Sequence, residues 1–152
     1  MKYLCIFAVA VLALAACKQS PETAAGSARS PLNGTWKLVS SKSITKDTVD
    51  TSPKADIETI KIFNDTSFAF FTHDLKQGKT KPPVYDSGAG LYTLSGENYT
   101  EKLKYCLERE WENHDFNFTM KVGKDTITQR GVEKIDSLHI DHIIIETYVR
   151  LK

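Results

Sequence analysis

The sequence has few cysteines, no excess of charge of either sign and no apolar run long enough for a permanent membrane anchor. Of its 152 residues, 20 are Lys or Arg and 19 are Asp or Glu. This balance does not provide the excess of basic residues with which proteins bind nucleic acids or anionic lipids. The apolar run that starts at Leu4 is shorter than the roughly 20 residues that span a bilayer. No Ser/Cys–His–acid arrangement, glycine-rich phosphate loop or HExxH motif occurs. We therefore predict no catalytic residue, no cofactor and no metal site.

The first sixteen residues have the layout of a secretory leader. Lys2 gives a positive start, residues 4–13 are almost purely apolar, and small residues precede Cys17. The segment Leu14-Ala15-Ala16-Cys17 resembles the lipobox of bacterial lipoproteins, in which the leader is cut before a cysteine that then carries lipid. The resemblance implies a leader over residues 1–16 and a lipid on Cys17; the alternative is an ordinary leader with an incidental cysteine. Lys18, in place of the Asp that retains some lipoproteins in the inner membrane, favours the outer membrane of the bacterial cell envelope.

Removal of the leader would leave one domain without a disulfide. Cys5 leaves with the leader and Cys17 carries lipid, so Cys106 has no partner within the chain. Cys106 is either a reactive thiol or a small buried residue. The remaining 19 basic and 19 acidic side chains balance, because the leader holds only Lys2. Residues 17–32 are rich in Ser, Ala, Pro and Gly and predict a lipidated, flexible tether, followed by a domain over residues 33–152.

From Trp36 onward, short runs of alternating apolar and polar residues are separated by turn residues, which predicts an antiparallel sandwich or barrel. Gly88 and Gly90 lie inside one such run and predict a bulge or sharp curvature. We expect one short helix over residues 107–114 and a loop over 73–83. Residues 43–55 should form a loop, alternatively with a short helix or a lid, and residues 131–141 either irregular chain or a single helical turn. The predicted strands cover residues 35–41, 57–63, 67–72, 84–94, 99–106, 116–122, 126–130 and 143–151.

The two ends of the domain carry a recognisable pair of motifs. Gly34-Thr35-Trp36 opens it and Tyr148-Val149-Arg150 closes it. This pairing resembles the lipocalin and calycin barrels, in which Gly-x-Trp begins the first strand and an Arg of the last strand lies over the Trp ring. Residues 90–101 also resemble the central hairpin of small lipocalin-like bacterial lipoproteins. The resemblance implies an all-β, antiparallel up-and-down β-barrel of about eight strands with one short helix, closed by a contact between Trp36 and Arg150.

Alternation along the strand at residues 99–106 predicts which side chains line the barrel. Tyr99, Glu101, Leu103 and Tyr105 share one face, and the opposite face is mostly solvent-compatible, so the first set should point inward. An inward carboxylate among tyrosines suits the polar head of a ligand. Glu101 is alternatively a structural acceptor for Tyr hydroxyls or Arg130, or a rim residue. The full set of predicted ligand-binding residues is Phe70, Tyr92, Tyr99, Glu101, Tyr105, Phe118 and Met120. Phe70, Phe118 and Met120 are alternatively packed core, since a small barrel can fill itself with side chains.

His139 and His142 could share one face of a helical turn, but no further ligand is placed near them by spacing, so no metal site is predicted. The expected function is non-enzymatic binding of a small apolar or amphipathic molecule in a barrel attached to the membrane through Cys17. The alternative is a filled barrel without a chamber that acts as a protein-interaction or scaffold lipoprotein. The volume of the interior separates the two hypotheses.

Overall fold

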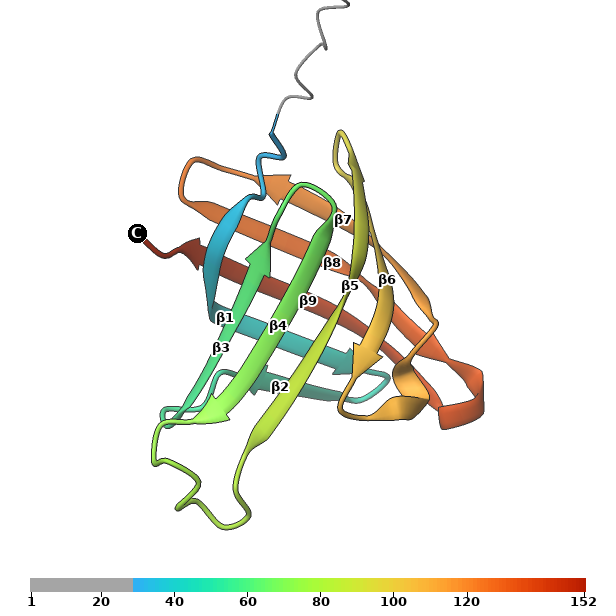
Figure 1. Ribbon diagram of the computed structural model, residues 1–152. Helices are drawn as coiled ribbons and strands as arrows, with labels where there is room; N and C mark the ends of the chain where they lie inside the picture. The colour runs from blue at the N-terminus through green and yellow to red at the C-terminus, as the bar shows by residue number, and fades with distance from the viewer. Residues whose placement is uncertain (1–28) are drawn as a thin grey trace, which may run out of the picture.

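The computed structural model describes residues 29–152, which form one antiparallel sheet that curls into a barrel (Figure 1). The predicted leader, Cys17 and the tether up to residue 28 lie outside the described residues. The order of the strands in the sheet is β2-β1-β3-β4-β5-β6-β7-β8-β9, and β1 also pairs with β9. The strands are β1 (Gly34–Thr45), β2 (Thr48–Ser52), β3 (Ile57–Phe63), β4 (Ser67–Asp74), β5 (Tyr85–Ser95), β6 (Asn98–Cys106), β7 (Asp115–Val122), β8 (Thr126–Ile135) and β9 (Ile140–Arg150).

Closure of the barrel depends on β1, which contacts three strands. Its first residues, Gly34–Lys37, pair with β3, while residues 36–44 pair with β9. Eight strands, β1 and β3 to β9, thereby form a closed ring, and closure removes the exposed sheet edges. The all-β, lipocalin-like barrel expected from the sequence is confirmed.

The ninth strand is a departure from the prediction. Residues 43–55 were expected to form a loop, but β1 continues to Thr45 and β2 pairs with its second half. All five residues of β2 are exposed, so no apolar alternation marks it in the sequence. Local polar contacts favour this hairpin instead, among them a 2.9 Å hydrogen bond between the hydroxyls of Thr45 and Thr48.

Two other predicted elements differ in extent. The expected helix over residues 107–114 is a single 3₁₀ turn, η1 (Arg109–Trp111), that has no capping side chain at its start and is followed by Asn113 in the left-handed region (φ 65°). The strand expected to end at Arg130 continues to Ile135, because β8 stays paired with β9 along its whole length. Residues 131–141 therefore hold the end of β8, the first residues of β9 and a second 3₁₀ turn, η2 (Asp136–Leu138), which is the single helical turn given as one of the two alternatives.

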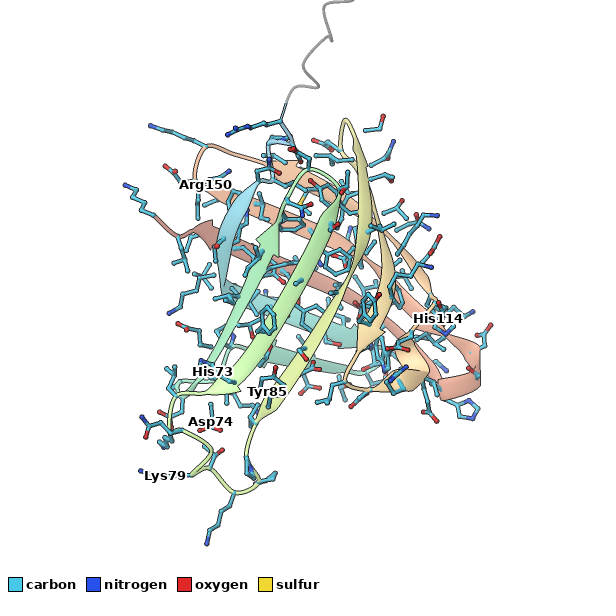
Figure 2. All side chains as sticks on the ribbon, in the orientation of Figure 1. His73, Asp74, Lys79, Tyr85, His114 and Arg150 are labelled. Carbon is cyan, nitrogen blue, oxygen red and sulfur yellow. The ribbon has the colours of Figure 1, made fainter. Side chains whose placement is uncertain are left out.

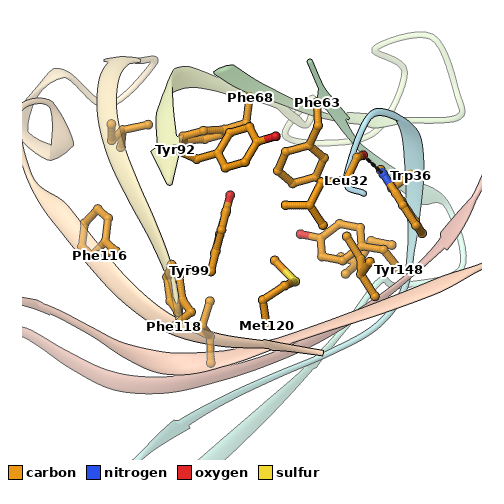
Figure 3. Close-up of a cluster of buried hydrophobic side chains, with 14 of the residues drawn as sticks. Leu32, Trp36, Phe63, Phe68, Tyr92, Tyr99, Phe116, Phe118, Met120 and Tyr148 are labelled. Atoms are coloured by element: carbon orange, nitrogen blue, oxygen red, sulfur yellow. Dashed lines mark hydrogen bonds between the residues drawn. The ribbon is translucent and has the colours of Figure 1, made fainter. Parts of the chain in front are cut away.

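An apolar cluster fills the end of the barrel where β1 begins (Figure 3). The sequence places Leu32 at the end of the tether, but its side chain is fully buried in this cluster. Its carbonyl accepts a 2.6 Å hydrogen bond from the Trp36 indole N–H. Ser30 also contacts the barrel, since its Oγ accepts a hydrogen bond from the Tyr92 hydroxyl. The packed domain therefore begins before residue 33. We call this region the apolar end; it comprises Leu32, Trp36, Phe63, Phe68, Tyr92, Tyr99, Met120, Ile127 and Tyr148.

The opposite end carries the longer connections. The β4–β5 connection hangs below the barrel, and η1 and η2 lie at the side of the same end (Figures 1 and 2). Asp74 holds the β4–β5 connection in place, because its carboxylate accepts hydrogen bonds from the backbone N–H groups of Lys76, Gly78 and Val84 at 3.0, 2.9 and 3.2 Å. We call this the open end. No helix within residues 29–152 has the length and apolar character needed to cross a membrane.

Candidate functional site

Below the apolar end, the barrel interior becomes polar. Lys61 of β3 and Glu101 of β6 form a buried ion pair, and Glu101 Oε1 also accepts a 2.7 Å hydrogen bond from the Tyr99 hydroxyl. Lys61 Nζ is 3.3 Å from Gln129 Oε1, and Gln129 Nε2 donates to Glu146 Oε2 at 3.0 Å. These four side chains come from four strands, and we call Lys61, Glu101, Gln129 and Glu146 the polar band. A buried ion pair requires such additional hydrogen bonds to offset its desolvation.

Aromatic rings surround the lysine of the polar band. Lys61 Nζ lies 5.1 Å from the ring centroid of Phe68, 5.7 Å from that of Phe63 and 5.8 Å from that of Tyr99. At these distances, ring faces attract a cation. The apolar end therefore helps to hold the Lys61 ammonium in the interior of the barrel.

A second polar pair lies nearer the open end. His142 Nε2 is 2.7 Å from Glu133 Oε2, which links β9 to β8. Burial raises the pKa of the Glu133 carboxyl, and the nearby charges of Glu146 and Glu101 act in the same direction. Burial likewise raises the pKa of Glu146, against the attraction of Lys61. Carboxylates in this interior thus lack full compensation for their negative charge.

Two cavities lie in the interior between the polar band and the open end. One of about 280 Å³ includes Lys61, Glu146 and Gln129 in its wall. The other, of about 230 Å³, includes Trp111, Phe116 and Cys106. Both are lined by Phe70, Asp86, Glu101 and Glu133, so they adjoin, and we call the pair the chamber. A larger hollow of about 670 Å³ lies over the outward residues Asn117, Thr119, Arg130 and Lys134 and is a surface feature.

The predicted ligand-binding residues divide into three groups. Phe70 and Glu101 line the chamber. Tyr92, Tyr99, Met120 and Phe118 are buried in the packed apolar cluster (Figure 3) and line neither cavity. Tyr105 is 70% exposed and points outward.

The prediction for Tyr105 is wrong because a bulge interrupts the alternation. Ala89 pairs with Tyr105 and the next residue, Gly90, pairs with Leu103, so Lys104 is an extra residue in β6. One extra residue reverses the side of the sheet to which all later side chains point. Gly90 is needed there because a Cβ atom at this position would overlap the carbonyl oxygen of Lys102.

Several chamber residues were not singled out from the sequence. Lys61 lies between Ile60 and Ile62, and in such a run a charged side chain gives no sign of facing the interior. The other three residues, Asp86, Glu133 and Glu146, have neighbours in the sequence that are polar or form only short apolar runs, so alternation does not show which way they point. The available signal was the inward register of β8 and β9, in which Ile127, Gln129 and Ile135 on one strand and Ile144 and Tyr148 on the other are buried.

The first and last strands of the barrel meet at the apolar end. The Arg150 guanidinium lies 4.0 Å from the centroid of the Trp36 ring, and these two residues are paired between β9 and β1. The guanidinium also donates hydrogen bonds to the carbonyls of Asn33 and Pro31. This is the geometry that the resemblance to lipocalins implies. It links the first strand, the last strand and the segment that precedes β1.

Cysteine and histidine form no further cluster in the described part of the chain. Cys106 is partly buried at the chamber wall, where burial raises the pKa of its thiol. His139 is in the left-handed region (φ 55°) after η2, and His142 contacts Glu133. Within residues 29–152, no three His, Cys, Asp or Glu side chains are arranged to hold a metal ion.

An eight-stranded antiparallel barrel that is closed by pairing of its first and last strands has a lipocalin-like fold. Neither a protein-family model nor a curated protein matches the chain by sequence. The structure is similar to that of a lipocalin-like protein from Bacteroides uniformis, with a TM-score of 0.51 over 80% of this chain and 100% of that one. The two share 13% sequence identity. The similarity therefore concerns the fold.

Proposed function

We propose that this protein binds a small apolar or amphipathic molecule inside its barrel. The observation that carries the proposal is the chamber, an interior space in a closed barrel that combines apolar walls at Phe70, Leu103 and Phe116 with a few convergent polar groups. This combination is typical of small-molecule sites. The lipocalin-like fold supports the same function, since barrels of this size can hold one small ligand.

We propose further that the protein acts at the bacterial cell envelope, attached through lipid on Cys17, and without catalysis. Several acyl chains on one cysteine would give stable attachment where a single chain would not, since each buried CH₂ contributes about 0.8 kcal/mol. The walls of the chamber include Pro53, Ile57 and Thr72, which lie toward the end of the barrel opposite the start of β1. A tether joined ahead of β1 would therefore leave the open end accessible.

The ligand proposal is tested by native mass spectrometry of the chain from Ser20 onward, which keeps every described residue, purified gently from its own host. We expect a retained small molecule that is lost on denaturation. A matched variant, Leu103→Trp, narrows the cavity of about 230 Å³ and should lower its occupancy. A mass without ligand for the wild-type protein, together with no change of Trp111 fluorescence on addition of a lipid extract of the host, would contradict the proposal.

The anchor is tested separately in the host. Replacement Cys17→Ala should move the protein from the membrane fraction to the soluble or unprocessed fraction and remove the mass of the lipid from its N-terminal peptide. Cys106→Ala is the matched control, because it removes the other cysteine outside the leader and should leave the protein in the membrane fraction. Equal membrane attachment of the Cys17→Ala variant and the wild type would exclude the lipid anchor.

A second candidate function is protein interaction through the outer surface, and one observation favours it. The outer faces of β4, β5 and β6 expose Phe71, Tyr85, Leu91 and Tyr105, which are 39%, 57%, 48% and 70% accessible. Exposed apolar residues that gather on one face are a feature of interaction surfaces. Replacement of Phe71 and Tyr105 by Ser should abolish co-purification of a partner in this case, and leave ligand retention unchanged.

A further inference from the structure

We propose that the ligand of the chamber is a cation, an amine or guanidinium group on a compact apolar or aromatic body. The inference rests on the proposed ligand-binding function and specifies its chemical class. Five acidic residues line the chamber: Asp86, Glu101, Glu133 and Glu146 come from four different strands, and Glu108 precedes η1. Lys61 is the one lysine or arginine among the described residues that line it. The chamber therefore has an excess of negative groups.

The single lysine is already engaged. Lys61 Nζ forms the ion pair with Glu101 and is within hydrogen-bond distance of Gln129. Its side chain is 4% exposed, so it is held within the polar band and the surrounding rings. A ligand anion entering the chamber would meet the other carboxylates before it met an available cation.

Two carboxylate oxygens of the chamber wall accept no hydrogen bond from another described residue. The Glu101 side chain is nine-tenths buried, and both of its hydrogen bonds, from Lys61 and Tyr99, end on Oε1. The Glu133 carboxylate contacts His142 through Oε2. Among the described residues, Glu101 Oε2 and Glu133 Oε1 accept no hydrogen bond, although both residues line both cavities. These oxygens are therefore available to hydrogen-bond donors of a ligand in the chamber, and a charged donor would form the stronger bond with a carboxylate.

The apolar part of the wall suits the same ligand class. Phe70 lines both cavities, and Trp111 and Phe116 line the one of about 230 Å³, with ring centroids 5.9 Å apart. Aromatic faces attract cations and pack against apolar bodies. The raised pKa values of Glu133 and Glu146 agree with this picture, because an incoming positive charge offsets the mutual repulsion of the carboxylates.

The class of ligand is tested with three probes that share a phenyl ring on a three-carbon chain and differ in the head group: 3-phenylpropylamine, 3-phenylpropanol and 3-phenylpropionate. Binding to the chain from Ser20 onward is measured at pH 7 by titration calorimetry and by Trp111 fluorescence. We expect the amine to bind about tenfold or more tightly than the alcohol, since a hydrogen bond to a charged group contributes more than a neutral one. The acid should bind more weakly than the alcohol.

Two single variants locate the effect in the chamber. Glu133→Gln and Asp86→Asn keep the size of the side chain and remove one charge, and each should lower the amine affinity several-fold while leaving the alcohol affinity unchanged. Glu58→Gln is the matched control, because Glu58 contacts Lys37 and His73 on the outer face of the barrel. Circular dichroism of each variant checks that the barrel has folded.

The possible results distinguish the inference that the ligand is a cation from the proposal that the barrel binds a ligand. Equal or tighter binding of the alcohol or the acid would overturn the cation class and leave the ligand-binding function standing. The same is true if the amine affinity is unchanged in both Glu133→Gln and Asp86→Asn. Absence of binding by all three probes at millimolar concentration would overturn the inference, and native mass spectrometry without a retained ligand would then overturn the function as well.

Discussion

Removal of the lysine from the polar band should destabilise the barrel far more than removal of a lysine from its surface. Lys61 and Glu101 are 4% and 10% exposed at their side chains. Replacement Lys61→Met leaves the Glu101 carboxylate with only the Tyr99 hydroxyl, in an interior that it shares with other carboxylates. Loss of one partner of a buried ion pair costs about 3–5 kcal/mol of unfolding free energy.

The assay is urea denaturation of the chain from Ser20 onward, followed by circular dichroism at pH 7. Small domains have m-values of about 1–3 kcal/mol/M in urea, so the midpoint should fall by about 2 M. The double variant Lys61→Met/Glu101→Leu removes both charges and should recover most of the loss, because apolar replacement of a whole buried pair is often neutral or stabilising.

Lys37 provides the matched control, since it pairs with Glu58 on the outer face and the two side chains are 41% and 30% exposed. Solvent screens such a pair, so Lys37→Met should cost about 0–1 kcal/mol. If Lys61→Met and Lys37→Met shift the midpoint equally, or if the double variant is less stable than Lys61→Met alone, the reasoning about the polar band is wrong.

Three further outcomes are expected in the same denaturation assay. Replacement Arg150→Leu removes the stack on Trp36 and two hydrogen bonds to carbonyls, which should cost about 2–3 kcal/mol; a cost below 0.5 kcal/mol, estimated for a surface site, would refute a closing role. Replacement Gly90→Ala forces a Cβ atom against the Lys102 carbonyl and should cost about 1–3 kcal/mol, whereas unchanged stability would show that the bulge adapts. Burial raises the pKa of Glu146 in the folded state above its unfolded value, so this residue stabilises the fold below about pH 4.5 and that contribution is lost as pH rises through the raised pKa. The stability of Glu146→Gln relative to wild type should therefore increase between pH 4 and pH 7, and a parallel pair of curves would contradict it.

The fold was predictable because its signals are local. Alternation and turn residues predict most of the strands, and the hairpin at Asn64 forms as expected, with its side-chain oxygen accepting hydrogen bonds from the backbone of Thr66 and Ser67. Such patterns depend only on neighbours in the chain. The strand β2 was missed because every one of its residues is exposed.

The chamber was harder to predict than the fold because the residues that form it are distant from one another in the sequence. Lys61 faces inward against the apolar pattern of β3, and its reason for doing so, Glu101, lies 40 residues away. Glu101 itself was placed correctly, because Tyr99 and Leu103 on the same face are buried. Tyr105 was misplaced two positions after Leu103, because a bulge depends on how two strands pair and not on one strand alone.

The interior of the barrel is divided between stability and recognition. The apolar end buries Trp36, Phe63, Tyr99 and Met120 almost completely, and this burial provides the main driving force for folding. The open end contributes little of this kind and instead holds carboxylates whose burial opposes folding. A sequence that keeps such groups inside a barrel gives up stability in the free protein. A cation in the chamber would supply hydrogen-bond donors and positive charge to these carboxylates, so they would stabilise the complex. The carboxylates that lower the stability of the free barrel would in this way give it selectivity for a cationic ligand.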